Sequence, residues 1–281
     1  MDAADVTARV GTVSMPPGAL PAAEERSDGT CSLPVLEPRP GEPAERVARR
    51  IGGTHPVRVF LVVVVAGYAL LAALTMSVGL LLTEFLVPVH GFEKWDNDIN
   101  RWLAEHRSPV LTDLSWLGST VAGGLVIPVV VGVLLFVFVV RREWLLAAFT
   151  LFVICVESGS YRATTLVVDR DRPPVHRLEG LDPTASFPSG HVAATVALYG
   201  GLLLLLASWI GRRWFSVLAI ALAIGLALFV GWARMYRGMH HLTDTTAGVI
   251  MGLLALSIMV FAARAATAAA NARDVARGES S

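Results

Sequence analysis

The chain has 281 residues, a formal net charge of zero and a mean hydropathy of +0.59, with 54% apolar and only 16% charged residues. Soluble globular proteins carry about 25% charged residues, so this composition favours a membrane protein over a soluble one. The balanced charge, with no basic stripe, argues against a nucleic-acid partner.

Residues 1–56 differ from the rest of the chain. They hold eight of the fifteen prolines and show no apolar periodicity. Such a segment buries too little apolar surface to offset its chain entropy, so we expect a disordered cytoplasmic tail, in which a short helix around Ala44 to Arg50 is possible.

Six apolar runs follow, each near the roughly 20 residues that a helix needs to cross a bilayer. Because backbone in lipid must satisfy its own hydrogen bonds, helices are expected rather than open strands. The predicted fold is therefore all-α: a six-helix membrane domain over residues 57–265, followed by a short cytoplasmic tail, 266–281. The expected spans are approximately Val59–Leu82, Thr120–Val140, Trp144–Val168, His191–Ile210, Phe215–Trp232 and Thr243–Ala263.

The basic residues predict the orientation, since short cytoplasmic loops are rich in Lys and Arg. Every second connection is basic, which places both termini inside and the connections 83–119, 169–190 and 233–242 outside. The first outer connection predicts an amphipathic helix at the membrane interface, with a packing or surface role, from the spacing of Trp95, Ile99, Trp102 and Leu103. The basic positions are Arg49, Arg50, Arg58, Arg141, Arg142, Arg212, Arg213, Arg264, Arg273 and Arg277.

The polar residues capable of chemistry gather at the outer ends of spans three to six. Ionisable groups at membrane depth are costly and usually mark a functional site. We therefore expect one site on the outer face, built from Arg170, Arg172, Ser189, His191, Arg234, His240 and Asp244.

The first motif is Pro188-Ser189-Gly190-His191, directly before the fourth span. Pro188 is expected to open the helix, so that the free backbone N–H groups of the first turn favour an anion. Gly190 would let a phosphate approach the backbone, with His191 placed to donate a proton. An ordinary helix cap beside an interfacial histidine is the alternative interpretation of this motif.

The second motif runs from Arg234 to Asp244. His240 and Asp244 lie four residues apart and share a helix face, so an Asp244 carboxylate that accepts the Nδ1 proton would leave Nε2 as a nucleophile. Arg234 adds a fork of donors suited to phosphate oxygens. An interfacial basic cluster would explain Arg237 and His241, but it would not explain why Asp244 faces His240.

A third cluster, Asp169-Arg170-Asp171-Arg172-Pro173, ends the third span. Its arginines could be membrane anchors or further phosphate ligands. In order and spacing, the three segments resemble the type 2 phosphatidic acid phosphatase family, which shares its site with the vanadium haloperoxidases. The family pattern is Lys, six residues, Arg-Pro; then Pro-Ser-Gly-His; then Ser-Arg, five residues, His, three residues, Asp.

Two positions depart from that pattern. Thr165 stands at the family lysine and Ala233 at the family serine. Arg170 or Arg162 could replace the missing positive charge, while Asp171 weakens the local positive field.

The resemblance implies a lipid phosphate or diphosphate phosphatase in the cell membrane that needs no metal or cofactor. His240 would attack phosphorus with Asp244 orienting it, and His191 would serve as acid and base. Arg172, Arg234, Ser189, the Gly190 N–H and Arg170 would hold the phosphoryl oxygens. The substrate classes considered are polyprenyl diphosphates, phosphatidate, lysophosphatidate and phosphatidylglycerol phosphate; the oligomeric state is not predicted.

The sequence leaves several alternative functions open. A phosphotransferase would use the same histidine, and a catalytically dead relative could bind without turnover. A transporter is suggested by Glu157 within the third span, although this carboxyl could instead bond a neighbouring helix near Ser158 and Ser160. Zinc bound by His191, His240, His241 and Asp244 is disfavoured because the adjacent arginines repel a cation.

Overall fold

The computed structural model describes residues 24–25, 31–51, 55–89, 91–180 and 185–278. Apart from a two-residue antiparallel pair, β1 (Glu24–Glu25) and β2 (Cys31–Ser32), every regular element in these ranges is helical. Within the described ranges, five helices are long and apolar enough to cross a membrane, or six if one bent pair counts as a single span. The predicted all-helical membrane fold is therefore confirmed.

The spanning helices coincide closely with the apolar runs of the sequence. One crossing is built from three consecutive helical segments, because a π-helical turn interrupts it without ending it. The three segments of that crossing are α7 (Gly190–Ala194), η2 (Thr195–Gly200) and α8 (Gly201–Ile210). The other spanning helices are α2 (Pro56–Leu81) with the turn η1 (Leu82–Leu86), α6 (Trp144–Thr165), α9 (Arg213–Tyr236) and α10 (Leu242–Arg277).

The second expected span is the one that differs most. The apolar run predicts one helix over Thr120–Val140, whereas the structure has α4 (Pro109–Val121) and α5 (Val126–Val140), bent by 42° at the break. Gly123 and Gly124 lie in that break. Glycine costs about 1 kcal/mol relative to alanine inside a helix, so the pair is a natural place for the helix to end.

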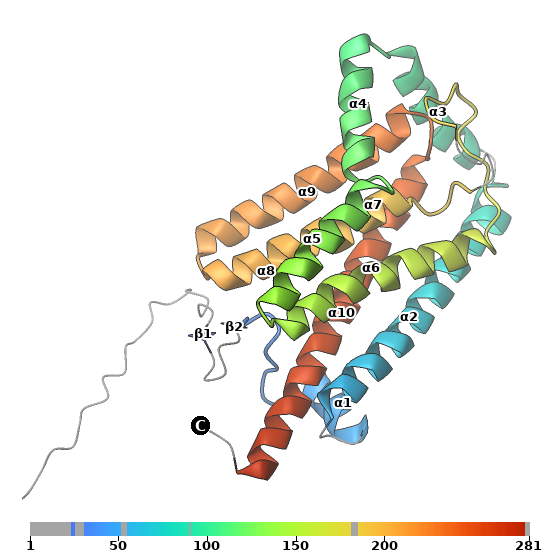
Figure 1. The fold of residues 1–281 in the computed structure, drawn as a ribbon. Coiled ribbons are helices and arrows are strands. Elements are labelled where there is room, and N and C mark those ends of the chain that lie inside the picture. Colours follow the sequence, from blue (N-terminus) through green and yellow to red (C-terminus); the bar gives the residue numbers. More distant parts are fainter. Residues whose placement is uncertain (1–23, 26–30, 52–54, 90, 181–184, 279–281) are drawn as a thin grey trace, which may run out of the picture.

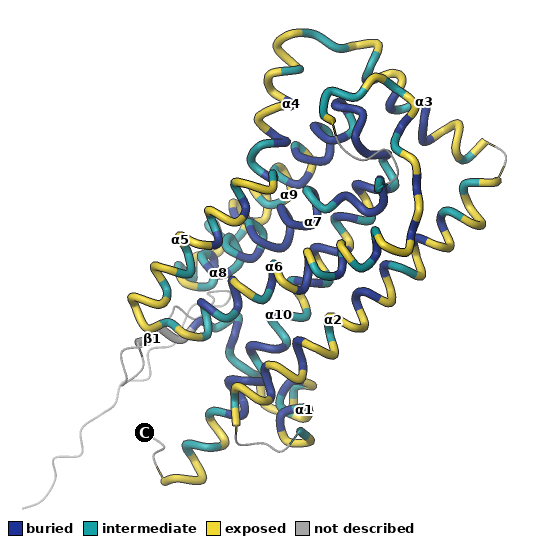
Figure 2. The backbone as a smooth tube through the Cα atoms, turned by 45° about the vertical axis from the view of Figure 1, so that its right-hand side comes forward, coloured by how far each residue is buried: buried dark blue, intermediate teal, exposed yellow. Residues whose placement is uncertain are grey.

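Helix α10 is the centre of the bundle and packs against α2, α6 and α7. Its Gly248 and Gly252 face α7 so closely that an added Cβ would lie 2.6 Å from the carbonyl oxygens of Ser189 and Ala193, respectively. Small residues four apart let two membrane helices approach closely. Buried residues concentrate where α7 meets α10, as Figure 2 shows.

Part of the expected disordered tail is ordered. The segment from Leu33 leads into α1 (Pro43–Ile51), which packs along α10, and Ala44 is fully buried there. Arg264 of α10 secures this contact by bonding the Val35 carbonyl and the Glu42 carboxylate. Residues 1–23 and 26–30 lie outside the described residues. The C-terminal tail predicted from residue 266 is instead a continuation of α10, because its alanines pack against α1.

The amphipathic helix predicted in the first outer connection is present as α3 (Phe92–Glu105). Its inward face is polar: Asp96, Asn97 and Asn100 are buried, whereas Trp95 and Trp102 are 50% and 58% exposed. Together, α3 and α4 form one end of the molecule, and α1 and the end of α10 lie at the opposite end (Figure 1).

Candidate active site

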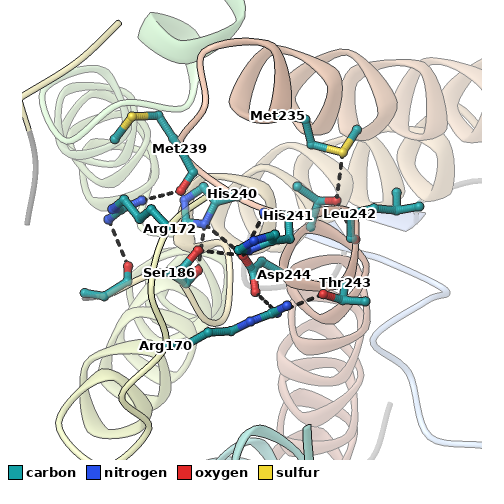
Figure 3. A network of polar contacts seen from close by, with 12 residues as sticks. Arg170, Arg172, Ser186, Met235, Met239, His240, His241, Leu242, Thr243 and Asp244 are labelled. Atoms are coloured by element: carbon teal, nitrogen blue, oxygen red, sulfur yellow. Dashed lines mark hydrogen bonds and ion pairs between the residues drawn. The ribbon is translucent and has the colours of Figure 1, made fainter. Parts of the chain in front are cut away.

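The three sequence motifs converge at the end of the bundle that carries α3. Arg172 donates to the carbonyls of Met239 and Ala185, and the Ser189 N–H donates to the Asp244 carbonyl at 3.0 Å. Figure 3 shows Ser186, His240 and Asp244 close together, with Arg172 beside Met239. The geometry therefore brings together segments that lie about 50 to 70 residues apart in sequence.

His240 is held in a defined tautomer. Its Nδ1 lies 2.7 Å from the Ser186 carbonyl oxygen, which can only accept, so Nδ1 carries the proton and Nε2 keeps its lone pair. Burial lowers the pKa of His240 well below its usual range, and the charges of Arg234 and Arg172 lower it further. The imidazole is thus neutral and nucleophilic at Nε2.

Asp244 does not accept the His240 proton as the sequence predicted. Its carboxylate is 3.9 Å from His240 Nδ1, beyond hydrogen-bonding distance. Instead it accepts from the Ser186 hydroxyl at 2.6 Å, from the His241 N–H at 2.8 Å and from Arg170. The competing Ser186 carbonyl takes the proton, so Asp244 positions His240 indirectly, through the Ser186 segment and the backbone of His241.

Arg170 has a different role from the phosphate ligand that the sequence suggested. It is only 7% exposed and is held between two carboxylates, Asp96 at 2.8 Å and Asp244, with a further bond to the Thr243 hydroxyl. Its charge is therefore compensated inside the protein. Arg170 joins α3 to the start of α10 and supports the site from outside it.

Arg234 is fully buried, yet two of its nitrogens have no partner among the described residues. Nη1 contacts Glu179 and Ser119, whereas Nε and Nη2 are buried and unbonded. Nε and Nη2 form one edge of the guanidinium, with two parallel donors that match two oxygens of a phosphate or carboxylate. A buried donor left without a partner costs about 1–3 kcal/mol, so this open edge favours an anionic ligand.

Ser189 also carries a buried polar group without a bonding partner among the described residues. It sits at the N-cap of α7 with no exposed surface, but its hydroxyl caps nothing and has no partner in the described parts of the chain. The helix begins at Gly190 rather than at the predicted Pro188. A Cβ on Gly190 would lie 3.1 Å from the Tyr161 ring, so close packing of α6 on α7 requires the glycine.

His191 lies in the first turn of α7, next to Gly190, and its positive form would lower the pKa of His240. We call Arg172, Arg234, Ser189, His191 and His240 the anion site.

Neither expected replacement for the family lysine fits that role. Arg162 is exposed, and the Thr165 hydroxyl bonds the Arg162 carbonyl of its own helix. Arg237, interpreted from sequence as an interfacial anchor, is only 6% exposed and bonds Glu179, Ser115 and the Leu178 carbonyl. Glu157 accepts from its neighbour Ser158, and none of the other described helices donates to it.

Sequence reasoning missed the residues that support the site from α3. Asn100 donates to the carbonyls of Met235 and His240, at 3.1 and 3.0 Å, and Asn97 bonds His241 Nε2 at 3.0 Å. Only the run of polar residues on one face of α3 hints at this role. A cavity of about 550 Å³ opens beside these residues and is lined in part by Asn97, Arg172, Arg177 and His241.

Part of the chain matches a known protein family. Residues 142–267 match the model of the PAP2 superfamily. This segment contains all three motifs, and the match confirms the resemblance drawn from the sequence. No curated protein matches the chain.

Two solved structures are similar. One is a transmembrane PAP2-type phosphatidylglycerolphosphate phosphatase from Bacillus subtilis, with a TM-score of 0.55 and 22% identity over 73% of this chain and 93% of that one. The other is LpxE from Aquifex aeolicus, with a TM-score of 0.46 and 22% identity over 58% of this chain and 92% of that one. The first comparison supports the fold assigned above.

Proposed function

We propose that this protein is a membrane lipid phosphatase that forms a phosphohistidine on His240. The observation that carries the proposal is a set of buried donors in the anion site, the Arg234 Nε and Nη2 and the Ser189 hydroxyl, which have no partner among the described residues and lie beside a neutral imidazole. A tetrahedral phosphoryl group satisfies these donors, and a nucleophile already holds the tautomer that attack requires.

The proposed reaction has two steps, of which the first transfers the phosphoryl group to His240. The lone pair on His240 Nε2 forms a bond to phosphorus, while the bond from phosphorus to the lipid oxygen breaks. His191 gives its proton to that leaving oxygen. Arg172 and Arg234 neutralise the charge that spreads over the phosphoryl oxygens during transfer, so positive charge from the protein serves where other enzymes use magnesium.

The second step regenerates the enzyme. His191, now neutral, takes a proton from water, and the water oxygen attacks the phosphorus of the phosphohistidine. The bond from phosphorus to His240 Nε2 breaks, inorganic phosphate leaves and the imidazole regains its lone pair. The Ser186 carbonyl holds the Nδ1 proton throughout, which stabilises the positive ring of the intermediate.

The membrane position narrows the substrate to a lipid phosphate or diphosphate. The anion site lies where the spanning helices end, so acyl or prenyl chains can stay in the bilayer while the headgroup enters. One similar solved structure is a phosphatidylglycerolphosphate phosphatase, which supports a lipid substrate. Polyprenyl diphosphates, phosphatidate, lysophosphatidate and phosphatidylglycerol phosphate are the classes to test.

The positive-inside rule supports an extracytoplasmic site in the plasma membrane, with both termini in the cytoplasm. The turns that carry Arg141, Arg142, Arg212 and Arg213 lie at the end of the bundle opposite to α3. Accessibility of single cysteines introduced at residues 105 and 212, one at each end, to a membrane-impermeant reagent checks this orientation.

The test of the function is phosphate release by purified protein, with a chelator present, across a panel of these lipids. We expect release from at least one lipid class, inhibition by orthovanadate, and loss of release in His240→Ala. His241→Ala is the matched control, because that ring lies next in sequence but bonds Asn97 and Asp244. Transfer of phosphate to an added alcohol instead of water would indicate a phosphotransferase. Activity in His240→Ala with none in His241→Ala would refute the assignment of His240 as the nucleophile.

A further inference from the structure

Glu179 is an acidic residue at the edge of a positively charged site. Its carboxylate accepts from Arg234 Nη1 with both oxygens, at 2.8 and 3.0 Å, and from the Ser119 hydroxyl at 2.7 Å. Arg237 Nε donates to the same carboxylate. Two guanidinium groups from the end of α9 and a hydroxyl from α4 thus meet on one side chain.

These contacts use a particular edge of the Arg234 guanidinium. Glu179 and Ser119 bond only Nη1, while Nε and Nη2 have no partner in the part of the chain that the structure describes. A carboxylate that imitated the substrate would take the Nε–Nη2 edge, where two parallel donors face two oxygens. Glu179 therefore leaves the phosphate edge free and holds the guanidinium from another side.

The loop that carries Glu179 is fastened to the bundle on both sides of its backbone. Leu178 exchanges two bonds with Arg237, donating to the Arg237 carbonyl and accepting from its Nη2. Arg107 donates to the His176 carbonyl at 2.8 Å and also bonds the Tyr236 carbonyl at the end of α9. The carboxylate therefore occupies a fixed position relative to α9.

The Glu179 carboxylate is negatively charged at neutral pH. Burial raises its pKa, but the Arg234 charge and the bonds from Arg234, Ser119 and Arg237 outweigh this and bring the pKa to about 2. Arg234 without a counter-charge would be a buried, unpaired cation, which is strongly unfavourable. The carboxylate thus makes a fully buried arginine tolerable before substrate arrives.

We propose that Glu179 is a positioning residue, which orients Arg234 so that its Nε–Nη2 edge receives the phosphoryl group. This inference rests on the proposed function and deepens it: the phosphate grip depends on an acidic residue outside the three motifs. Glu179 touches no reacting atom, and it acts through the arginine alone.

The experiment compares Glu179→Gln, Glu179→Asp and Arg234→Ala with the double variant Glu179→Gln/Arg234→Ala. Glu105→Gln, the same exchange at an exposed residue of α3, is the matched control. We expect Glu179→Gln to lower kcat/KM by about tenfold or more, since a displacement of about 1 Å at a positioned group costs about 100-fold. Glu179→Asp should restore part of the loss, and Glu105→Gln should match the wild type.

The double variant separates positioning from general stabilisation. If Glu179 acts through Arg234, adding Glu179→Gln to Arg234→Ala changes kcat/KM by less than about twofold. Multiplication of the two losses, or a Glu179→Gln variant within about twofold of the wild type, would overturn the inference.

Orthovanadate binding distinguishes this inference from the proposed function. If the wild type binds vanadate but releases no phosphate, the proposed function is contradicted. The inference about Glu179 is then tested by the Kd for vanadate: binding at least about tenfold weaker in Glu179→Gln than in the wild type supports it, and equal binding overturns it. A wild type that neither binds vanadate nor releases phosphate refutes both.

Discussion

The contact between α7 and α10 gives a prediction whose size can be worked out from the structure. The Gly248→Ala variant adds one methyl group, which would lie 2.6 Å from the Ser189 carbonyl oxygen and 3.2 Å from Val192 Cβ. The Ser189 oxygen is backbone and already accepts the first α7 bond, from the Ala193 N–H, so it cannot move alone.

The two helices must therefore separate by about 0.8 Å before the methyl group reaches ordinary contact distance. Overpacking costs about 1–3 kcal/mol, while alanine returns about 0.5–1 kcal/mol of helix preference. The displaced turn carries Ser189 and His191, and a misplacement of about 1 Å costs about 100-fold in rate. We expect kcat to fall by about ten- to 100-fold, with a net loss of stability of about 0–2.5 kcal/mol.

The assay measures kcat, KM and the thermal unfolding temperature in one detergent. Gly225→Ala on α9 is the matched control, because a Cβ there would meet nothing within 4 Å, and we expect it to keep its activity and to lose no stability. A Gly248→Ala variant whose kcat equals that of Gly225→Ala would show that close approach of α7 and α10 does not position the anion site.

Three further outcomes are expected. Asn100→Ala removes both bonds that hold the Met235 and His240 carbonyls, so unfolding free energy should drop by about 1–3 kcal/mol and kcat should fall; unchanged kinetics would show that α3 has no part in the site. Arg170→Ala leaves two buried carboxylates without their cation and should destabilise by about 3–5 kcal/mol, whereas a rise in KM with full stability would return Arg170 to the role of phosphate ligand. The pKa of Glu179 is lowered from 4.5 to about 2 on folding, so its carboxylate stabilises the protein fully above pH 4.5 and loses this effect as the pH falls towards 2. The stability difference between wild type and Glu179→Gln should shrink over that range, and a difference that grows on acidification would contradict the lowered pKa.

The sequence predicts most of the helices and the convergence of the motifs, because both depend on features that are local or strongly periodic. Apolar runs of about 20 residues leave little choice but a spanning helix. Three ordered motifs, each at the same end of its span, can then meet only at that end. Arg172, Ser189 and His240 are found together for this reason.

The partners of the site residues could not be predicted in the same way. Spacing of four residues predicted a shared helix face, but His240 precedes α10, which begins at Leu242, so this prediction is wrong. The two side chains still lie 3.9 Å apart, and a backbone carbonyl 54 residues away, that of Ser186, takes the proton. Asn100 reaches the His240 carbonyl across 140 residues, and no periodic pattern encodes such a contact. Glu179 likewise lies in a connection without periodicity, and its role appears only when α4 and α9 lie beside it.

The amino-terminal segment shows a further limit. Its composition, rich in proline and alanine, is typical of disorder, yet Ala44 and Ala48 pack on the alanines of α10. Small side chains carry little hydrophobic signal, although they allow close packing between helices. Composition therefore predicted disorder for a segment that tertiary contact orders.

The most direct test of the account is to trap the phosphorylated enzyme. Protein mixed with a lipid carrying a radiolabelled phosphate and quenched rapidly in alkali should retain label that is stable in base and released by acid, as a phosphorylated imidazole requires. Peptide mapping should place this label on His240, and His240→Ala should retain none. Label on His241 or on a serine, or steady phosphate release by His240→Ala, would contradict attack by His240.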